Sequence, residues 1–296
     1  MITADAASSR SKPPVVGVVG GSGLYKVFES GTDRTVVIST PYGPTSAPIR
    51  IGELGGRTVA FVPRHGDAHS VPPHAINYRA NVWALASLGV RAIVSMTAVG
   101  GIAKETRPGR FVLPDQIIDR TWGRFDSYFD GGTSVQHLPF ADPYCPELRR
   151  CAAVALAALG EDFVPSGTTV VIQGPRFSSR AESQWFRAAG VSIVNMTQYP
   201  EVALAAELNV GMVNVSFVTD SDAGDAGDAG DGEDGAGEAT SAELVFERMA
   251  AAAPRIHSAV AAIVASVPID YAPRNLIAPG AVAEVLALGA LEPSAD

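Results

Sequence analysis

Cysteine is scarce in this sequence: Cys145 and Cys151 are the two among 296 residues. Their spacing matches no metal-binding or redox motif, so neither a disulfide framework nor a cysteine-based metal site is expected. Buried or free thiols suit a reducing compartment, and we therefore predict a cytoplasmic location. The first residues contain no apolar segment of the kind that forms a signal peptide, and we expect residues 1–14 to be a disordered tail.

The sequence also lacks an apolar run that predicts a membrane-spanning helix, and it lacks an excess of basic residues. Its 22 Lys and Arg stand against 31 Asp and Glu, which gives a net charge of −9. Eight of these acids lie between Asp220 and Glu238, in a stretch that holds no Lys or Arg. Without this stretch the charges nearly balance. The composition therefore argues against nucleic acid and against a membrane as partners.

The remaining composition, 47% apolar and 18% charged, is that of a globular protein. Apolar runs rich in β-branched residues alternate with helical patterns through most of the chain, which predicts an α/β fold. We expect a single domain at residues 15–267, with a central mixed β-sheet flanked by helices. Residues 223–239 have the Gly, Ala and Asp composition of a flexible acidic insert, and residues 268–296 are predicted to be a C-terminal tail.

Polar residues and glycines gather where the predicted strands end. In open α/β folds, ligands bind beyond the carboxyl ends of the strands. The segments at these ends are 20–23, 64–65, 97–98, 173–177, 195–197 and 219–222. We therefore predict that these segments together form one site.

Three of these segments suggest a chemistry, each beside a structural alternative. The loop at residues 20–23 does not have the G-x-G-x-x-G spacing of dinucleotide-binding folds, but its amides and Ser22 suit an anion; otherwise it is a tight turn. Arg64 offers a planar set of donors for phosphate oxygens, or it belongs to a surface pair. Phe177 can stack on a heterocycle, or it is a core aromatic.

The acidic stretch does not match a calcium site. An EF-hand loop that started at Asp220 would need Gly at its sixth position, where the sequence has Asp225. The Gly-Asp-Ala repeats also lack the nonapeptide spacing of calcium-binding β-rolls. We therefore predict no metal site.

Taken together, several motifs in this order resemble the trimeric purine nucleoside phosphorylase family, and in particular its 5′-methylthioadenosine phosphorylase branch. The motifs span about residues 15–265 and are VGVVGGSGLY, TPYGPTSAPIRIGEL, FVPRHG, INYRANVWAL, MTAVGGI, FVLPDQIIDRT, VVIQGPRFSSRAESQWFR, VNMTQYPEV and FVTDSDAG. The resemblance implies phosphorolysis of an N-glycosidic bond, with a nucleoside and inorganic phosphate as small-molecule partners. It implies no metal or organic cofactor, and a homotrimer with its sites at the subunit interfaces.

The resemblance also implies roles for individual residues. Phosphate would be held by Ser22, Arg64, His65, Thr97, Ala98 and Thr197. The nucleoside would be bound by a second set of residues. These are Phe177 and Ser178 beside the base, Met196 under the ribose, His69, Val245 and Phe246 around the 5′ group, and His137 from a neighbouring subunit. Asp220 and Asp222 would be catalytic, facing N7 and the exocyclic amine of the purine. Burial beside a second carboxylate favours a protonated acid that can serve the leaving base.

The residue types implied for the base and the 5′ group favour 5′-methylthioadenosine. A 6-amino group is a donor and suits the carboxylate of Asp220, whereas the 6-oxopurine branch carries Asn there and Glu at the position of Ser178. Val245 and Phe246 would form an apolar wall that suits a thioether better than a hydroxyl. A phosphorylase for another 5′-modified adenosine, a broader purine nucleoside phosphorylase, and a nucleoside-binding protein without activity remain as alternatives. Gln198 departs from the residues expected after the NMT motif.

Overall fold

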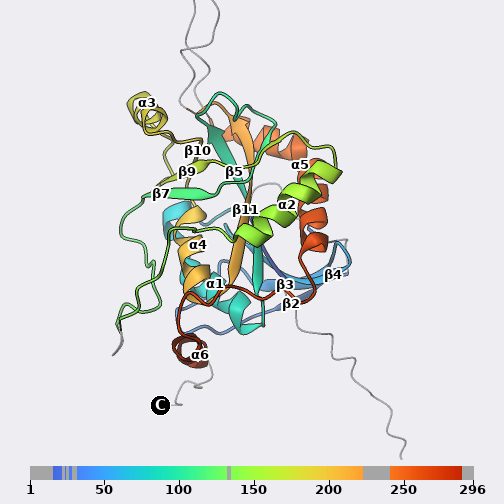
Figure 1. Cartoon of the computed structure of the whole chain (residues 1–296), viewed down its shortest axis with the longest axis vertical. Coiled ribbons are helices and arrows are strands. Elements are labelled where there is room, and N and C mark those ends of the chain that lie inside the picture. Colours follow the sequence, from blue (N-terminus) through green and yellow to red (C-terminus); the bar gives the residue numbers. More distant parts are fainter. Residues whose placement is uncertain are drawn as a thin grey trace, which may run out of the picture.

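The computed structural model describes residues 16–21, 24, 27–28, 32–131, 135–222 and 241–288. The predicted N-terminal tail and acidic insert lie outside these residues. In the described part of the chain, eleven strands form one mixed sheet, with helices on both of its faces (Figure 1). The predicted fold class, an α/β domain with a mixed central sheet flanked by helices, is confirmed.

The strands and helices alternate along the chain as the apolar patterns indicate. The strands are β1 (Val16–Gly20), β2 (Arg34–Val36), β3 (Ile49–Leu54), β4 (Arg57–Pro63), β5 (Ala92–Gly101), β6 (Phe111–Val112), β7 (Gln116–Arg120), β8 (Phe163–Val164), β9 (Thr168–Ile172), β10 (Ile193–Asn195) and β11 (Gly211–Asp220). The helices are α1 (Tyr78–Ser87), α2 (Pro146–Ala158), α3 (Arg180–Ala188), α4 (Gln198–Glu207), α5 (Ala242–Ser266) and α6 (Pro279–Ala287), and a short 3-10 turn spans Pro73–Ala75.

Strand β5 lies at the centre of the sheet and pairs with three other strands. It pairs in parallel with β1 on one side and with β11 on the other, and its last residues pair antiparallel with β10. The main path of the sheet runs β2-β3-β4-β1-β5-β10-β9-β7, and β11 continues to β6 and β8. Because β10 runs against β5, the end of β10 returns to the middle of β5. There Asn195 donates a hydrogen bond to the carbonyl of Ala98 over 3.2 Å.

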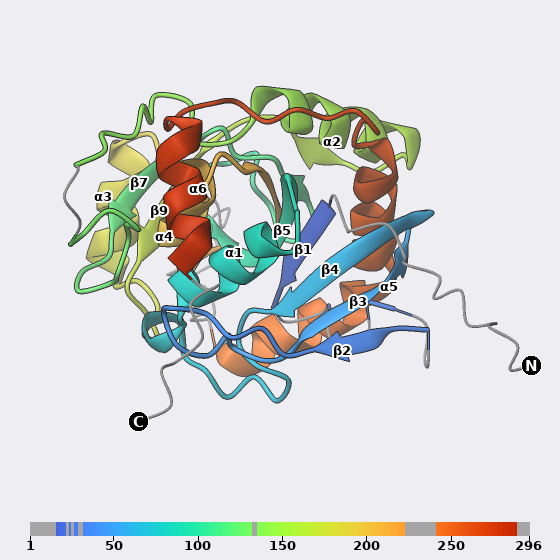
Figure 2. The same ribbon diagram turned by 90° about the horizontal axis from the view of Figure 1, so that it is seen from below.

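Both faces of the central strands are buried, as continuous apolar runs predict. In β5, Val94 packs with helices α2 and α5, while Ile93 packs on the other side with α1 and α4. Figure 2 shows these helices on opposite sides of the central strands. This double cover fixes the strand ends that carry the polar side chains.

One segment differs from the expected single strand. The run FVLPDQIID at residues 111–119 predicts one strand in the sequence. In the structure these residues form β6 and β7, which join different parts of the sheet: β6 pairs with β11 and β8, and β7 pairs with β9. The division falls around Pro114, which has no amide hydrogen to give to a ladder. The prediction of one continuous strand was therefore wrong.

Helix α5 is long and apolar enough, by length and composition, to cross a membrane. In this fold, however, one face of the helix is part of the core, where Met249, Ile256, Val260 and Ile263 are buried. It packs on α2 and on β11. Its apolar character therefore follows from its place over the sheet.

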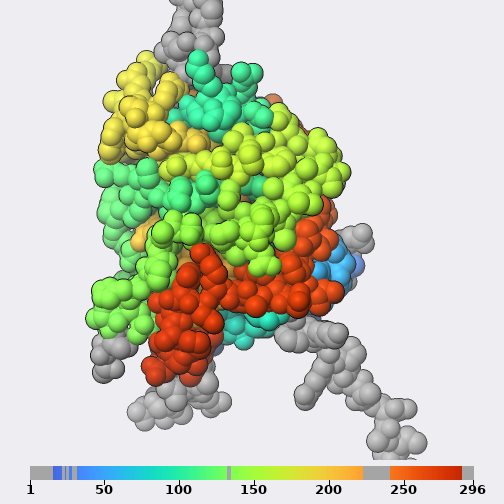
Figure 3. Space-filling view, viewed as in Figure 1, coloured from blue at the N-terminus to red at the C-terminus, as the bar shows by residue number. Residues whose placement is uncertain are grey.

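The chain continues past α5 into α6, where Val282 and Val285 are buried in the same cluster as α1. The indole of Trp83 donates to the carbonyl of Val285 over 3.0 Å. Figure 3 shows this C-terminal segment, in red, covering part of the surface beside α2. Residues 268–288, part of the predicted tail, thus pack on the domain.

Candidate active site

A cavity of about 520 Å³ lies where the polar strand ends meet. Its lining comes from β5, β9, β10 and β11, from the loops that follow β1, β4, β9, β10 and β11, and from the start of α5. Each of the segments predicted to form one site contributes at least one residue to this cavity. These segments therefore meet at one cavity, as the topological argument predicts.

The cavity lining also includes most of the individually predicted site residues. They are Arg64, His65, His69, Thr97, Ala98, Phe177, Ser178, Met196, Thr197, Asp220, Asp222, Val245 and Phe246. Two predicted residues are not among them: Ser22 lies outside the described residues, and its neighbour Gly21 lines the cavity instead. His137 is exposed and away from the lining. The roles of all these residues stay predictions.

The position of Thr97 and Ala98 differs from expectation in one respect. They do not end a strand, because β5 continues to Gly101. They reach the cavity because β10 runs antiparallel to the end of β5 and brings Asn195 and its successors to the middle of that strand. The Asn195 carboxamide oxygen then accepts from the amides of Thr197 and Gln198, each over 2.7 Å, and so shapes the turn into α4.

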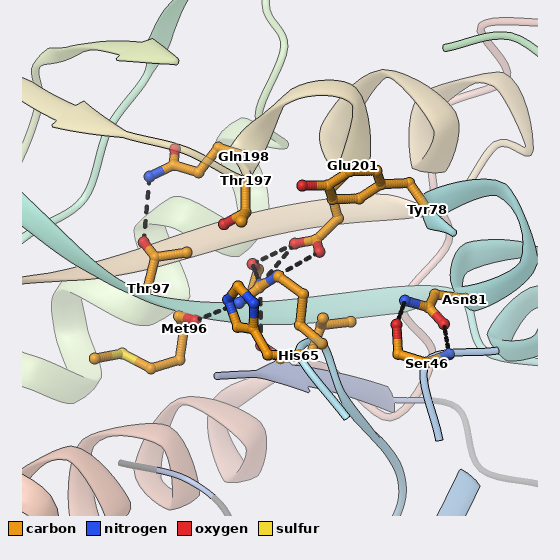
Figure 4. Close-up of polar contacts among 12 residues, drawn as sticks. Ser46, His65, Tyr78, Asn81, Met96, Thr97, Thr197, Gln198 and Glu201 are labelled. Carbon is orange, nitrogen blue, oxygen red and sulfur yellow. Dashed lines mark hydrogen bonds and ion pairs between the residues drawn. The ribbon is translucent and has the colours of Figure 1, made fainter. Parts of the chain in front are cut away.

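Arg64 is 1% exposed and is held by a carboxylate that the sequence reasoning missed. Glu201 on α4 accepts from Arg64 Nε over 2.7 Å and from Nη2 over 2.8 Å (Figure 4). Ser95 donates to the same carboxylate over 2.7 Å, and Arg64 Nη1 donates to the carbonyl of Met96 over 3.1 Å. The guanidinium is thus fixed in a fully buried, charge-balanced arrangement at the cavity wall.

His65 and His69 form a stacked pair beside Arg64, with ring centroids 4.4 Å apart. Burial, and then the neighbouring Arg64 charge, lowers the pKa of His65 to about 4. Its Nδ1 lies 2.9 Å from the carbonyl of Val71, so Nδ1 carries the proton and Nε2 is the unprotonated nitrogen of a neutral ring. Burial also lowers the pKa of His69. Phe246 meets the His69 ring edge to face at 5.1 Å.

The two predicted catalytic carboxylates are buried: Asp220 is 5% exposed and Asp222 is 4% exposed. A register shift between Val218 and Asp220 breaks the pairing of β11 with β5, which re-aims the chain as a β-bulge does. Asp220 Oδ1 then accepts from the amide of Asp222 over 2.9 Å, and Oδ2 accepts from Thr219 over 2.8 Å. Ser183 on α3 donates to the carboxylate of Asp222.

Gly100 provides the space in which these carboxylates lie. A Cβ at this position would come within 3.2 Å of Asp220 Oδ1 and of Asp222 Cβ, and within 3.0 Å of Val194. Contacts this close force a neighbour to move. Both glycines of the TAVGG motif therefore have a direct steric reason, because a Cβ at Gly101 would lie 1.9 Å from the carbonyl oxygen of Thr106.

The residues predicted to meet the base offer an aromatic face and an unused hydroxyl. Phe177 is 36% exposed, in keeping with a loop aromatic rather than a core one. The Ser178 hydroxyl is buried and has no hydrogen-bond partner among the described residues. Because buried polar atoms are normally paired, this hydroxyl is suited to a polar group of a ligand.

The described residues contain no group of three or more His, Cys, Asp or Glu arranged to hold a metal ion. The fold and the cavity instead define an α/β protein with buried hydrogen-bond donors around Arg64 and Thr97 and two carboxylates at Asp220 and Asp222. This combination suits a ligand pair made of an anion and a polar heterocycle.

Comparison with known proteins agrees with this description of the fold and the cavity. The phosphorylase superfamily profile matches residues 15–265. An S-methyl-5'-thioadenosine phosphorylase of Mycolicibacterium smegmatis is 54% identical over 210 residues, which cover 71% of this chain and 78% of the relative. A purine nucleoside phosphorylase of Streptomyces coelicolor is 46% identical over 262 residues, which cover 86% of this chain and 89% of the relative.

A solved structure of a methylthioadenosine phosphorylase from an antarctic soil metagenomic library aligns with a TM-score of 0.78 and 34% identity. The alignment covers 95% of this chain and 100% of that one. The chain therefore belongs to the phosphorylase superfamily, and the family resemblance seen in the motifs is confirmed.

Proposed function

We propose that the protein catalyses the phosphorolysis of 5′-methylthioadenosine to adenine and 5-methylthioribose 1-phosphate. Relatives with the corresponding name at about half identity support this reaction. The observation that carries the proposal is the content of the cavity: one continuous lining holds anion donors, an exposed aromatic ring and two buried carboxylates.

The reaction breaks the bond between C1′ and N9 and forms a bond between C1′ and a phosphate oxygen. The electron pair of the broken bond goes to the purine, and a proton delivered to N7 neutralises it. Asp220 is the group that supplies or holds this proton. The cationic sugar of the transition state is stabilised by the phosphate, which Arg64, Thr97 and Thr197 keep in place.

Base selection follows from donors and acceptors. The 6-amino group of adenine donates, and the buried carboxylates of Asp220 and Asp222 accept. Ser183 donates one hydrogen bond to the Asp222 carboxylate, a group whose two oxygens can accept several. A 6-oxo base would leave two buried acceptors facing each other, which is costly.

Selection of the 5′ group rests on an apolar wall. Val245 and Phe246, at the start of α5, line the cavity together with His69, whose ring lies against Phe246. Burial keeps His69 in its neutral form, because it lowers the pKa of that ring. A methylthio group fits this surface, and a 5′-hydroxyl would lose its water partners there.

We further propose that the enzyme needs no cofactor, acts in the cytoplasm in purine and methionine salvage, and assembles as a homotrimer. Exposed large side chains in the same stretch of the sequence as His137 support a subunit interface: Trp122 is 73% exposed, Phe125 69% and Val135 75%. In this assembly His137 reaches the site of a neighbouring subunit. Light scattering that gives the mass of one chain at assay concentration would contradict the trimer.

The reaction is tested by mixing the protein with 5′-methylthioadenosine and measuring adenine release with and without inorganic phosphate. Release that requires phosphate is expected. The matched variant Asp220→Asn keeps the shape of the side chain and removes the acid, and turnover is expected to fall by about two orders of magnitude or more. Unchanged turnover in this variant would remove Asp220 from the mechanism.

A further inference from the structure

Beneath the proposed phosphate position lies a buried polar network that the reaction as described does not use. Its centre is Gln198, the first residue of α4, which is 1% exposed. The Gln198 carboxamide reaches across to two strands. Its Nε2 lies 3.3 Å from Thr97 Oγ1 on β5 (Figure 4). The same nitrogen lies 3.1 Å from Ser216 Oγ on β11. Tyr144, which is also buried, lies against the other end of the carboxamide.

The direction of each hydrogen bond follows from its partners. Burial raises the pKa of Tyr144, so this phenol keeps its proton and donates it to Gln198 Oε1. The two amide hydrogens of Gln198 are therefore directed at Thr97 and Ser216. Ser216 in turn donates to Asn214 Oδ1 over 2.7 Å.

These hydrogen-bond directions determine where the Thr97 hydroxyl can donate its proton. Its oxygen accepts from Gln198, so its own hydroxyl proton must go elsewhere. Two protein acceptors lie 3.3 Å from the Thr97 hydroxyl, Asn214 Oδ1 and Ser216 Oγ. Asn214 already accepts the shorter bond from Ser216, and Ser216 already accepts the shorter bond from Gln198. Thr97 lines the cavity, so an anion that enters there offers its hydroxyl a stronger acceptor.

We propose that Gln198 is a positioning residue, which orients the Thr97 hydroxyl as a donor toward the phosphate co-substrate. The proposal rests on the phosphorolysis proposed above and adds to it a residue that does not itself touch the substrates. Gln198 acts through Thr97, and its own hydrogen bonds remain within the protein.

The test is steady-state kinetics with phosphate and 5′-methylthioadenosine varied separately. Gln198→Met keeps the length of the side chain and removes its amide, and the KM for phosphate is expected to rise about five- to tenfold, the value of one hydrogen bond. Gln198→Glu places an acceptor beside Thr97 and draws its proton away from the anion, so a larger rise is expected. The KM for the nucleoside should stay within about twofold in both variants. Among the described residues, Thr97 is the one predicted site residue to which the Gln198 side chain is hydrogen-bonded, and it is predicted to bind phosphate.

The control is Thr169→Val on β9. The Thr169 hydroxyl is buried, has no hydrogen-bond partner among the described residues and does not line the cavity, so both KM values should be unchanged. A structural role for Gln198 alone would instead raise both KM values together, or lower the amount of active enzyme with both unchanged. Either result would overturn the proposal.

A double-mutant cycle tests whether Gln198 acts through Thr97. In a Thr97→Val background, Gln198→Met should change the phosphate KM by less than about twofold, and full additivity would contradict the proposal. If Gln198→Met does not fold, Tyr144→Phe removes only the donor to Gln198, and it should raise the phosphate KM about two- to threefold. No rise in that variant would also contradict the proposal.

The same assays separate this inference from the function on which it rests. A wild-type protein that releases no adenine in the presence of phosphate refutes the proposed function. A wild-type protein that does so, with a phosphate KM that Gln198→Met leaves unchanged, refutes only the role of Gln198.

Discussion

Glu201 offers a quantitative test of how the site is held together. Its carboxylate is 3% exposed and pairs with Arg64, which is 1% exposed, through two hydrogen bonds of 2.7 and 2.8 Å. Replacing it by Gln leaves the guanidinium buried without its counter-charge. Breaking a buried pair from one side costs about 3–5 kcal/mol in the free energy of unfolding. For a chain of this size, each kcal/mol lowers the melting temperature by roughly 2–4 °C, so a fall of about 10 °C is expected.

The assay is thermal unfolding followed by circular dichroism, at one protein concentration. Asp162→Asn is the matched control, because its pair with Arg110 lies at the surface and Asp162 is 70% exposed. A surface pair contributes about 0–1 kcal/mol, so this control should melt within about 3 °C of the wild type. The double variant Arg64→Met/Glu201→Met, which removes both charges, should be less destabilised than Glu201→Gln. A Glu201→Gln protein that melts with the control would refute the importance of charge balance at Arg64.

Three further predictions concern the carboxylates and the histidine. Gly100→Ala should lower kcat/KM at least about tenfold, because its Cβ would displace Asp220; unchanged kinetics would contradict the steric argument. Because the folded-state pKa of His65 is lowered from 6.5 to about 4, its contribution to stability is complete above pH 6.5 and is lost as the pH falls toward 4. The difference between the unfolding free energies of the wild type and His65→Asn should therefore change by about 3 kcal/mol over this window, and urea titrations at each pH measure it. Ser183→Ala should raise the KM for the nucleoside about threefold or more, through Asp222, with the phosphate KM unchanged.

The location of the site could be predicted from the sequence because it depends on strand ends. A run of β-branched residues followed by a polar pair, as before Arg64 and before Asp220, marks both a strand and its end. The α/β alternation then places such ends together, whatever the chemistry. The structure brings these segments to one cavity.

Glu201 could not be found in this way. It lies in an apolar helical run, and its partner Arg64 is 137 residues away, so no local pattern links them. A signal was nevertheless present, since a Glu flanked by Val202, Ala203 and Leu204 in a buried helix requires a counter-charge. The sequence also did not show that Thr97 lies in the middle of a strand. Thr97 becomes a site residue because β10 pairs antiparallel with the end of β5, and such a long-range pairing leaves no local pattern.

Gln198 is an intermediate case. The sequence marked it as a departure from the expected motif and gave no role for it. Its partners are Thr97 on β5, Ser216 on β11 and Tyr144 in the loop before α2, and only their packing shows that both ends of the carboxamide are hydrogen-bonded. Buried polar networks of this kind are specified by tertiary structure more than by spacing.

The most direct measurement of the central claim is a comparison of 5′-methylthioadenosine, 5′-deoxyadenosine, adenosine and inosine, each with phosphate, under one set of conditions. Base release from 5′-methylthioadenosine should be the fastest by kcat/KM, with adenosine slower and inosine slowest by orders of magnitude. Faster release from inosine than from the 6-amino substrates would contradict the base assignment to Asp220 and Asp222.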